Sequence, residues 1–213
     1  KSATTTLTTI LPRHPDIFIS KPKEPKFFGR YHSKGWDWYA SRFKDGSLLA
    51  LRGEASTLYA SRMKSFRRAP ELMRRCLPHL KLIYIVRHPL DRIVSQWRHY
   101  RGRRPDCADF RDLMDDRTLR RLVVGCSLYY RHLSSFREHF PDEQIHCMTF
   151  EDLLDDPDRS LRQMLRFLGV KPRLKLILES DRTLPRENIA GAKGRGHVDK
   201  PDWDPALRKR VLK

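Results

Sequence analysis

Short apolar runs alternate with amphipathic stretches along this chain of 213 residues, and this alternation constrains the fold more than any other feature. The run "KLIYIVR" at 81–87 is almost unbroken, which is typical of a buried central strand of a parallel sheet. Further strands are predicted at 16–20, 47–54 and 143–150. Strands separated by helices predict an α/β domain with a central, mostly parallel β-sheet flanked by helices.

Apolar residues recur at helical spacing between these strands. Helices are predicted at Thr4 to Leu11, Ser33 to Phe43, Ala69 to Leu77, Pro89 to Tyr100, Leu119 to Phe140 and Ser160 to Leu168, and in the closing "DPALRKRVLK". Pro89 suits the first position of its helix, and Gly169 is expected to cap a helix C-terminus. Residues 171–202 show weak periodicity and much charge, so a long functional or partly disordered loop is expected there.

The length fits a single domain over residues 1–213, and an apolar fraction of 39% can bury a core. Both ends are expected to be truncated, because a strand normally feeds a phosphate loop in such sheets and this chain begins at the loop. The apolar runs fall short of the roughly 18 residues of a membrane span. The opening "KSATTTLTTILPRHP" has too short an apolar stretch for a signal peptide. We therefore expect no membrane span.

The chain is strongly basic, with 44 Lys and Arg against 26 Asp and Glu and a formal charge of +18. Such a charge predicts an anionic partner, such as a phosphate, a sulfate, nucleic acid or an acidic membrane.

The four cysteines are widely spaced, with no CxxC pair and no histidine at metal-ligand spacing; they are Cys76, Cys107, Cys126 and Cys147. This pattern favours buried free thiols over a zinc site, so no metal is expected. It also favours a reducing cytoplasm.

The first six residues, "KSATTT", have the chemistry of an anion-binding loop. Lys1 supplies an ammonium, Ser2 and Ala3 are small enough for close backbone approach, and 4–6 supply hydroxyls at a helix start. A threonine-rich helix start also serves as a simple N-cap. "KS" would equally end an ATP-binding G-x-x-x-x-G-K-[ST] loop, whose glycines would precede residue 1.

A second element lies in "IVRHPLDRIVSQWRHY" at 85–100. Arg87 is placed at the carboxyl end of the central strand, where open parallel sheets bind ligands, and Ser95 follows eight residues later. A guanidinium and a hydroxyl suit a phosphate monoester. Alternatively, Arg87 caps the strand and Ser95 faces solvent.

Together these segments resemble the sulfotransferases that use 3′-phosphoadenosine 5′-phosphosulfate (PAPS), most closely their heparan sulfate and related glycan branch. "KSATTTL" resembles the 5′-phosphosulfate loop and "VRHPLDRIVSQW" the 3′-phosphate motif. The resemblance continues in order through "KEPKFFGRYHSKGWDWYASRF", "GEAST", "SLYYRHLSSFREHF", "FEDLLDDPDRSLRQMLRFLGV" and "AKGRGH". The resemblance implies a P-loop-like three-layer domain.

The resemblance also implies an activity, in which a sulfuryl group passes from PAPS to a hydroxyl or amine and adenosine 3′,5′-bisphosphate (PAP) is released without a metal. Positioning and charge stabilisation supply most of the catalysis in comparable phosphoryl transfers. Lys1 would lie at the bridging oxygen. The residues implied to bind the nucleotide are Lys1, Ser2, Ala3, Thr4, Thr5, Thr6, Arg87, Ser95, Lys193, Gly194 and Arg195.

The acceptor must lose a proton as it attacks, so a base is needed within hydrogen-bond reach. Glu24 in "KEPKFF" matches the catalytic glutamate of the heparan branch; on its own it would be a solvated carboxylate paired with one of the lysines at 21, 23 or 26. Glu54 in "GEAST" is the second candidate, or a carboxylate that only orients a loop. Tyr129 matches a family tyrosine, although its helical spacing is also that of a core residue.

The chain departs from the heparan branch at two points. Ala55 stands where that branch usually has lysine, and no cysteine follows Cys147 to close the branch's common disulfide. These departures favour a cytoplasmic, bacterial relative that acts on another hydroxyl, such as that of a glycan, a lipid or a small metabolite.

Two other classes compete. A basic nucleic-acid-binding protein would use clusters such as "RHYRGRRP" at 98–105, although no helix-turn-helix, RNA-recognition or zinc-finger signature accompanies it. A P-loop kinase or NTPase would need a magnesium-binding acid at a strand end, where this chain has Arg87.

Overall fold

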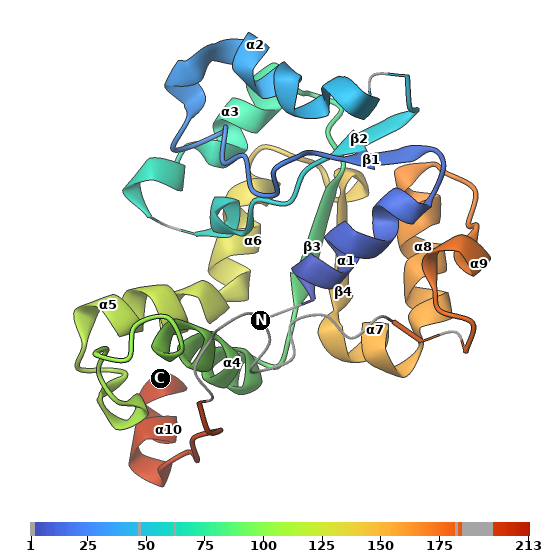
Figure 1. Cartoon of the computed structure of the whole chain (residues 1–213). Coiled ribbons are helices and arrows are strands. Elements are labelled where there is room, and N and C mark those ends of the chain that lie inside the picture. Colours follow the sequence, from blue (N-terminus) through green and yellow to red (C-terminus); the bar gives the residue numbers. More distant parts are fainter. Residues whose placement is uncertain (1–2, 47, 62, 182, 185–197) are drawn as a thin grey trace. The chain divides into compact units, whose positions relative to one another are not determined.

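The computed structural model describes residues 3–46, 48–61, 63–181, 183–184 and 198–213 (Figure 1). These residues group into two compact units. The larger unit contains residues 3–86 and the described residues from 130 to 184, and the smaller unit contains residues 87–129 and 198–213. The expectation of a single sulfotransferase domain over 1–213 stays a prediction.

The predicted strands all form, and they pair in parallel. In the larger unit β1 (Ile17–Ile19) pairs with β2 (Leu51–Gly53), and β3 (Leu82–Val86) pairs with β4 (Ile145–Thr149). The strands β1 and β2 have three residues each, so both are shorter than the predicted ranges 16–20 and 47–54. Parallel pairing brings the loop that follows β1 beside the loop that follows β2.

The strands β3 and β4 lie between two layers of helices. Successive side chains of a strand point to opposite faces, so each strand contributes to the packing on both sides. Ile83 and Ile85 pack against a core cluster formed with α1 (Thr4–Ile10), whereas Leu82 packs against an aromatic cluster on the other face. Figure 1 shows α1 and α8 on one side of these strands and α6 on the other. The α/β prediction is thereby confirmed, although β3 is half-buried along its length rather than fully buried.

The first core cluster joins α1, β1 and α8 (Pro157–Leu168). Leu161, Met164 and Leu165 repeat at helical spacing on α8 and are fully buried. Asp156 caps the start of α8, since its side chain accepts the backbone N–H of Arg159. The helix ends at Gly169, whose φ of 85° is the left-handed conformation expected of a C-terminal cap.

The second core cluster is aromatic and lies under α2 (Gly35–Ala40), α3 (Ala69–Cys76) and α6 (Tyr129–Arg137). Phe27 stacks on Tyr39 with ring centroids 4.4 Å apart, and Phe28 meets Tyr39 edge to face. This cluster anchors the segment that follows β1.

The smaller unit is helical. Its α4 (Pro89–Arg101) buries Ile93, Val94 and Trp97 against residues around α5 (Arg117–Leu119) and α10 (Pro205–Val211). The prediction of one helix from Leu119 to Phe140 is wrong. The chain passes through a π-helical turn at 120–124 and a 3₁₀ turn at Gly125–Ser127, and the helix is interrupted at Leu128 before α6 begins. Gly and Ser have low helix propensity, and Leu128 is not helical, with φ −79° and ψ 65°.

Shorter elements complete the described chain. They are η1 (Leu11–Arg13), η2 (His32–Lys34), η3 (Ser41–Gly46), η4 (Thr57–Ala60), η5 (Lys64–Phe66), η6 (Phe110–Asp112), η7 (Arg120–Val124), η8 (Gly125–Ser127), η9 (Asp142–Gln144), α7 (Phe150–Asp155) and α9 (Leu174–Ile177). None of the helices that the structure describes is long and apolar enough to cross a membrane.

The cysteines are free, as predicted, but the prediction that they are buried is wrong. Cys76 and Cys147 are exposed, and Cys107 and Cys126 are partly exposed. Cys76 is the last residue of α3, and Cys147 lies on the face of β4 opposite the buried Met148.

Candidate functional site

The loop that follows β1 carries Glu24 in an unusual backbone conformation. Glu24 and Lys26 have φ values of 61° and 53°, in the left-handed region that non-glycine residues seldom occupy. Such residues cost about 1 kcal/mol or more each and are retained where the surrounding structure holds them. Here the backbone N–H of Lys26 donates to Ser56 Oγ at 2.9 Å, which ties the loop to the segment after β2.

The Glu24 carboxylate receives one donor on each oxygen. Thr57 Oγ1 donates to Oε1 at 3.2 Å, and Lys26 Nζ lies 3.3 Å from Oε2. The side chain is 28% exposed. A carboxylate oxygen accepts more than one hydrogen bond, so Glu24 keeps acceptor capacity toward a ligand. Of the lysines at 21, 23 and 26 that the sequence offered as partners, Lys26 makes the ion pair.

Glu54 lies at the carboxyl end of β2 inside a cluster of hydroxyl groups, which we call the Glu54 cluster: Glu54, Tyr39, Tyr59 and Ser56. Oε1 accepts from Tyr39 at 3.0 Å and from Tyr59 at 2.8 Å, and Oε2 accepts from Ser56 at 2.6 Å. Burial raises the pKa of Glu54 even though these hydrogen bonds act to lower it. Burial and the neighbouring carboxylate likewise raise the pKa values of Tyr39 and Tyr59.

The Glu54 cluster supports the loop that carries Glu24. Ser56 donates to Glu54 and accepts the N–H of Lys26, while Tyr59 Oη donates to Glu54 and accepts the N–H of Phe28 at 3.2 Å. Because both Glu54 oxygens already receive buried donors, its geometry is that of a carboxylate that orients a loop. This was one of the two interpretations of Glu54.

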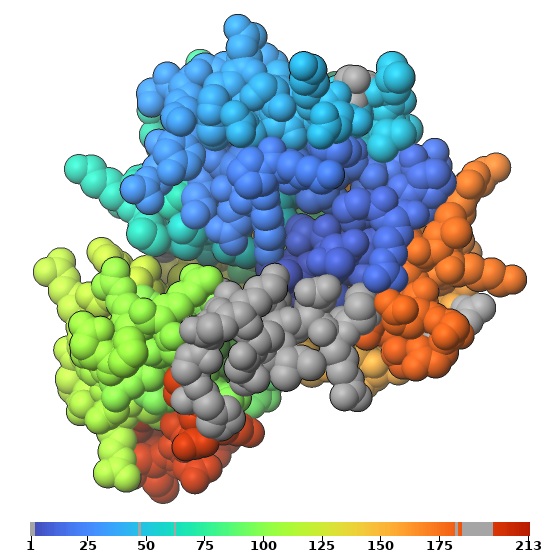
Figure 2. Space-filling model, viewed as in Figure 1, coloured from blue at the N-terminus to red at the C-terminus, as the bar shows by residue number. Residues whose placement is uncertain are grey.

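The helix α1 supplies the predicted threonines. Ala3 precedes it with a φ of 48°, and Thr5 Oγ1 accepts a hydrogen bond of 3.0 Å from Lys23 Nζ. Thr4 and Thr5 are partly exposed, whereas Thr6 is buried. Figure 2 shows the atoms of α1, in dark blue, directly beside the paler blue segment that follows β1. Lys1 and Ser2 lie outside the described residues.

The smaller unit carries the other half of the predicted constellation. Arg87 follows directly after β3, and its backbone N–H donates to Tyr129 Oη at 3.3 Å. Ser95 lies on α4 and is half-buried. Tyr129 is therefore a neighbour of Arg87, a contact that the sequence did not predict. Lys193, Gly194 and Arg195 lie outside the described residues.

Three residues that hold Glu24 in place were not predicted from the sequence: Ser56, Thr57 and Tyr59. Ser56 and Thr57 stand in "GEAST", directly after β2, and polar residues at a strand end were the available signal. The remaining contact, from Tyr59, depends on the aromatic cluster and has no signature in the sequence.

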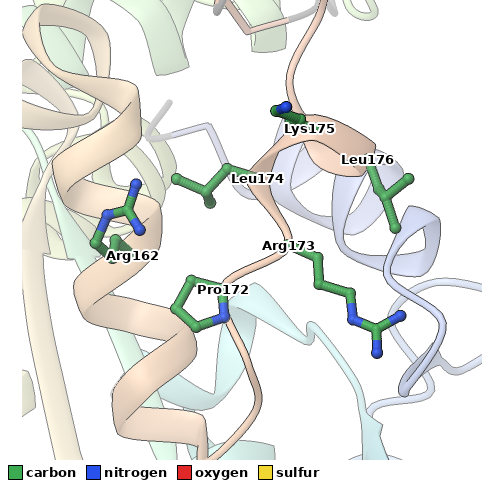
Figure 3. Close-up of a pocket in the computed structure, with 6 residues that line it drawn as sticks. All are labelled: Arg162, Pro172, Arg173, Leu174, Lys175 and Leu176. Atoms are coloured by element: carbon green, nitrogen blue, oxygen red, sulfur yellow. The ribbon is translucent and has the colours of Figure 1, made fainter.

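A separate hollow of about 400 Å³ lies in the larger unit between α8 and α9. Figure 3 shows Leu174 pointing toward Arg162 of α8, with Pro172 below it. Arg162 is paired with Asp158 at 2.7 Å. No predicted site residue lines this hollow, and in the described part of the chain no three His, Cys, Asp or Glu side chains gather as metal ligands.

Several arginines of the basic segment at 98–105 make contacts within the smaller unit. Arg101 lies 3.4 Å from Asp109 and donates to the carbonyl of Cys107, and Arg104 lies over the ring of Tyr100. These contacts do not favour a nucleic-acid surface.

Comparison with known proteins places these features in context. The family model described as the sulfotransferase domain matches residues 1–188. Heparan sulfate glucosamine 3-O-sulfotransferase 3B1 of Mus musculus is 31% identical over 179 residues, which cover 80% of this chain and 44% of that protein. Heparan sulfate glucosamine 3-O-sulfotransferase 6 of Homo sapiens is 30% identical over 179 residues, which cover 80% of this chain and 50% of that protein. The chain thus spans about half the length of these curated relatives.

Solved structures share the fold. A sulfotransferase from Alicyclobacillus acidocaldarius superposes with a TM-score of 0.76 at 22% identity, covering 99% of this chain and 85% of that one. The mouse sulfotransferase SULT7A1 complexed with PAP superposes with a TM-score of 0.52 at 22% identity, covering 80% of this chain and 56% of that one.

Proposed function

Because this chain belongs to the sulfotransferase-domain family, we propose that it transfers a sulfuryl group from PAPS to a hydroxyl or amine of an acceptor and releases PAP. In this reaction PAPS supplies the sulfuryl group, PAP keeps the electron pair of the broken S–O bond, and the acceptor oxygen or nitrogen loses a proton. A base on the protein must take that proton.

Glu24 is proposed as the base, and its geometry is the observation that carries the proposal. The backbone holds it in a left-handed conformation after β1, and each carboxylate oxygen has one protein donor. A proton acceptor that is fixed in place and still accessible fits general-base catalysis, because proton transfer needs hydrogen-bond reach. Glu54 acts as a positioning residue, through Ser56 and Tyr59.

The nucleotide assignments rest on the motifs. The 5′-phosphosulfate would be held by Lys1, Ser2, Ala3 and the threonines at 4–6. The remaining contacts to the nucleotide would come from Arg87, Ser95, Lys193, Gly194 and Arg195. Ammonium, guanidinium, hydroxyl and backbone N–H donors fit the oxygens of phosphate and sulfate. Tyr129 would keep the backbone at Arg87 in place.

The acceptor is proposed to differ from heparan sulfate. The names of the relatives give heparan sulfate as their substrate. This chain differs from the heparan branch in having Ala55 and no cysteine after Cys147. A hydroxyl on another glycan, a lipid or a small metabolite is the proposed acceptor class. The cytoplasmic location stays a prediction from the cysteines.

Transfer of a radiolabelled sulfuryl group from PAPS to a panel of hydroxylated acceptors tests the proposal. Glu24→Gln should lower the turnover number roughly 10²- to 10⁴-fold while it retains PAP affinity. The control, Glu138→Gln, removes an exposed carboxylate on the same larger unit. Equal loss in both variants, or full activity in Glu24→Gln, would remove Glu24 from this role.

A further inference from the structure

Lys23 is a half-buried cation, and among the described residues no carboxylate pairs with it. Its Nζ makes one hydrogen bond to the part of the chain that the structure describes, to Thr5 Oγ1 at 3.0 Å, and no carboxylate oxygen there lies within 4 Å. Its neighbours in the same loop differ. Lys26 is paired with Glu24 at 3.3 Å, and Lys21 is exposed.

Burial of an unpaired ammonium is unfavourable, because the charged form loses hydration that a single neutral hydroxyl does not replace. Burial accordingly lowers the pKa of Lys23, although the charge of Glu24 opposes the shift. An ammonium has three N–H donors, and Thr5 accepts one of them. An anion beside Thr5 would compensate the charge and use the remaining donors.

The position of Lys23 indicates which anion it would bind. Its partner, Thr5, belongs to the segment at 1–6 assigned to the 5′-phosphosulfate, and the next residue, Glu24, is the proposed base. Within "GEAST" at 53–57 there is no cation, because position 55 is alanine.

We propose that the Lys23 ammonium, held by Thr5, binds the 5′-phosphosulfate of PAPS. This inference rests on the function proposed above. Lys23 acts through its positive charge, and it makes no covalent bond. Its charge stabilises the negative oxygens of the phosphosulfate, and it would do so beside the acceptor that Glu24 deprotonates.

Two nucleotides that differ only in the 5′-phosphate separate this role from a structural one. Titration calorimetry with PAP and with adenosine 3′-monophosphate would be run on the whole chain and on Lys23→Met. We expect PAP affinity to fall roughly tenfold or more, since hydrogen bonds to charged groups carry about this much. The affinity for adenosine 3′-monophosphate should not change, because that nucleotide lacks the group that Lys23 binds.

Matched variants complete the experiment. Lys21→Met removes a charge from an exposed position of the same loop and should leave both affinities unchanged. Lys23→Arg keeps the charge and should retain more PAP affinity than Lys23→Met. The proposal would be overturned if Lys23→Met lowered the affinity for both nucleotides equally, or lowered neither affinity. If the unaltered chain binds PAP normally in that case, the function proposed above survives; if it binds no PAP, both proposals fail.

Discussion

The hydroxyl of Ser56 donates a 2.6 Å hydrogen bond to Glu54 Oε2 and accepts the backbone N–H of Lys26 at 2.9 Å. One side chain thus connects a buried carboxylate after β2 with the loop after β1. The arrangement explains how a left-handed backbone at Glu24 and Lys26 is held in place, since the hydrogen bond fixes the loop at the second of these residues.

Removing the Glu54 carboxylate should destabilise the larger unit. In Glu54→Ala the hydroxyls of Tyr39, Tyr59 and Ser56 lose their shared acceptor, and buried donors without a partner are costly. We expect the free energy of unfolding in urea to fall by roughly 2–4 kcal/mol. Glu138→Ala is the control, because Glu138 is exposed. Equal stability of the two variants would contradict the role given to the Glu54 cluster.

The same residue predicts a pH dependence. Burial raises the pKa of Glu54 above its ordinary value of 4.5, so the folded chain binds this proton more tightly than the unfolded chain. Its contribution to stability is complete below pH 4.5 and is lost as the pH rises through the raised pKa. Glu54→Gln lacks this titration.

The difference in unfolding free energy, unaltered chain minus Glu54→Gln, should therefore fall as the pH rises from 4.5 toward neutrality. Urea unfolding of both proteins across this range measures the difference. A difference that stays constant, or grows with pH, would show that burial does not raise this pKa.

Tyr129 and Tyr130 form a natural pair of test and control. Tyr129 Oη accepts the N–H of Arg87, whereas Tyr130 is 84% exposed. Removal of one hydroxyl by Tyr129→Phe should weaken PAP binding several-fold, in line with about 1 kcal/mol for a neutral hydrogen bond. Tyr130→Phe should leave the affinity unchanged. If calorimetry finds the two variants alike, the hydrogen bond has no part in nucleotide binding.

Shortening a buried side chain of the first core cluster should cost much of the chain's stability. Leu161 is fully buried on α8, and Leu154 on α7 is 53% exposed. Leu161→Ala should lower the unfolding free energy by about 2–5 kcal/mol, and Leu154→Ala by much less. Urea unfolding compares them directly, and similar losses would mean that α8 is not packed as described.

The sequence predicted the elements of the fold better than their limits. Apolar runs located each strand, and Gly169 marked the end of α8, because these signals lie in neighbouring residues. The change to a 3₁₀ turn at Gly125–Ser127 was missed, since Val124 and Leu128, four residues apart, continue the apolar helical pattern across it. Burial of Cys147 was predicted wrongly. Side chains alternate along a strand, and the neighbouring residue, Met148, takes the buried face of β4.

The site residues stay predictions, and the sequence left two of them open as the base. Glu24 and Glu54 were both proposed as bases, and sequence alone did not separate them. The distinction comes from tertiary contacts, because Tyr39 reaches Glu54 from 15 residues away while Thr57 reaches Glu24 from 33. The position of Lys23 beside Thr5 joins residues 18 apart in the same way.

Titration calorimetry of PAP, against ATP with magnesium, tests the central claim most directly. The unaltered chain should bind PAP without a metal and prefer it to ATP. The double variant Lys1→Ala plus Arg87→Ala should lose that binding, because it lacks both cations proposed to bind the phosphates. Absence of PAP binding by the unaltered chain, or equal binding by the double variant, would contradict the sulfotransferase proposal.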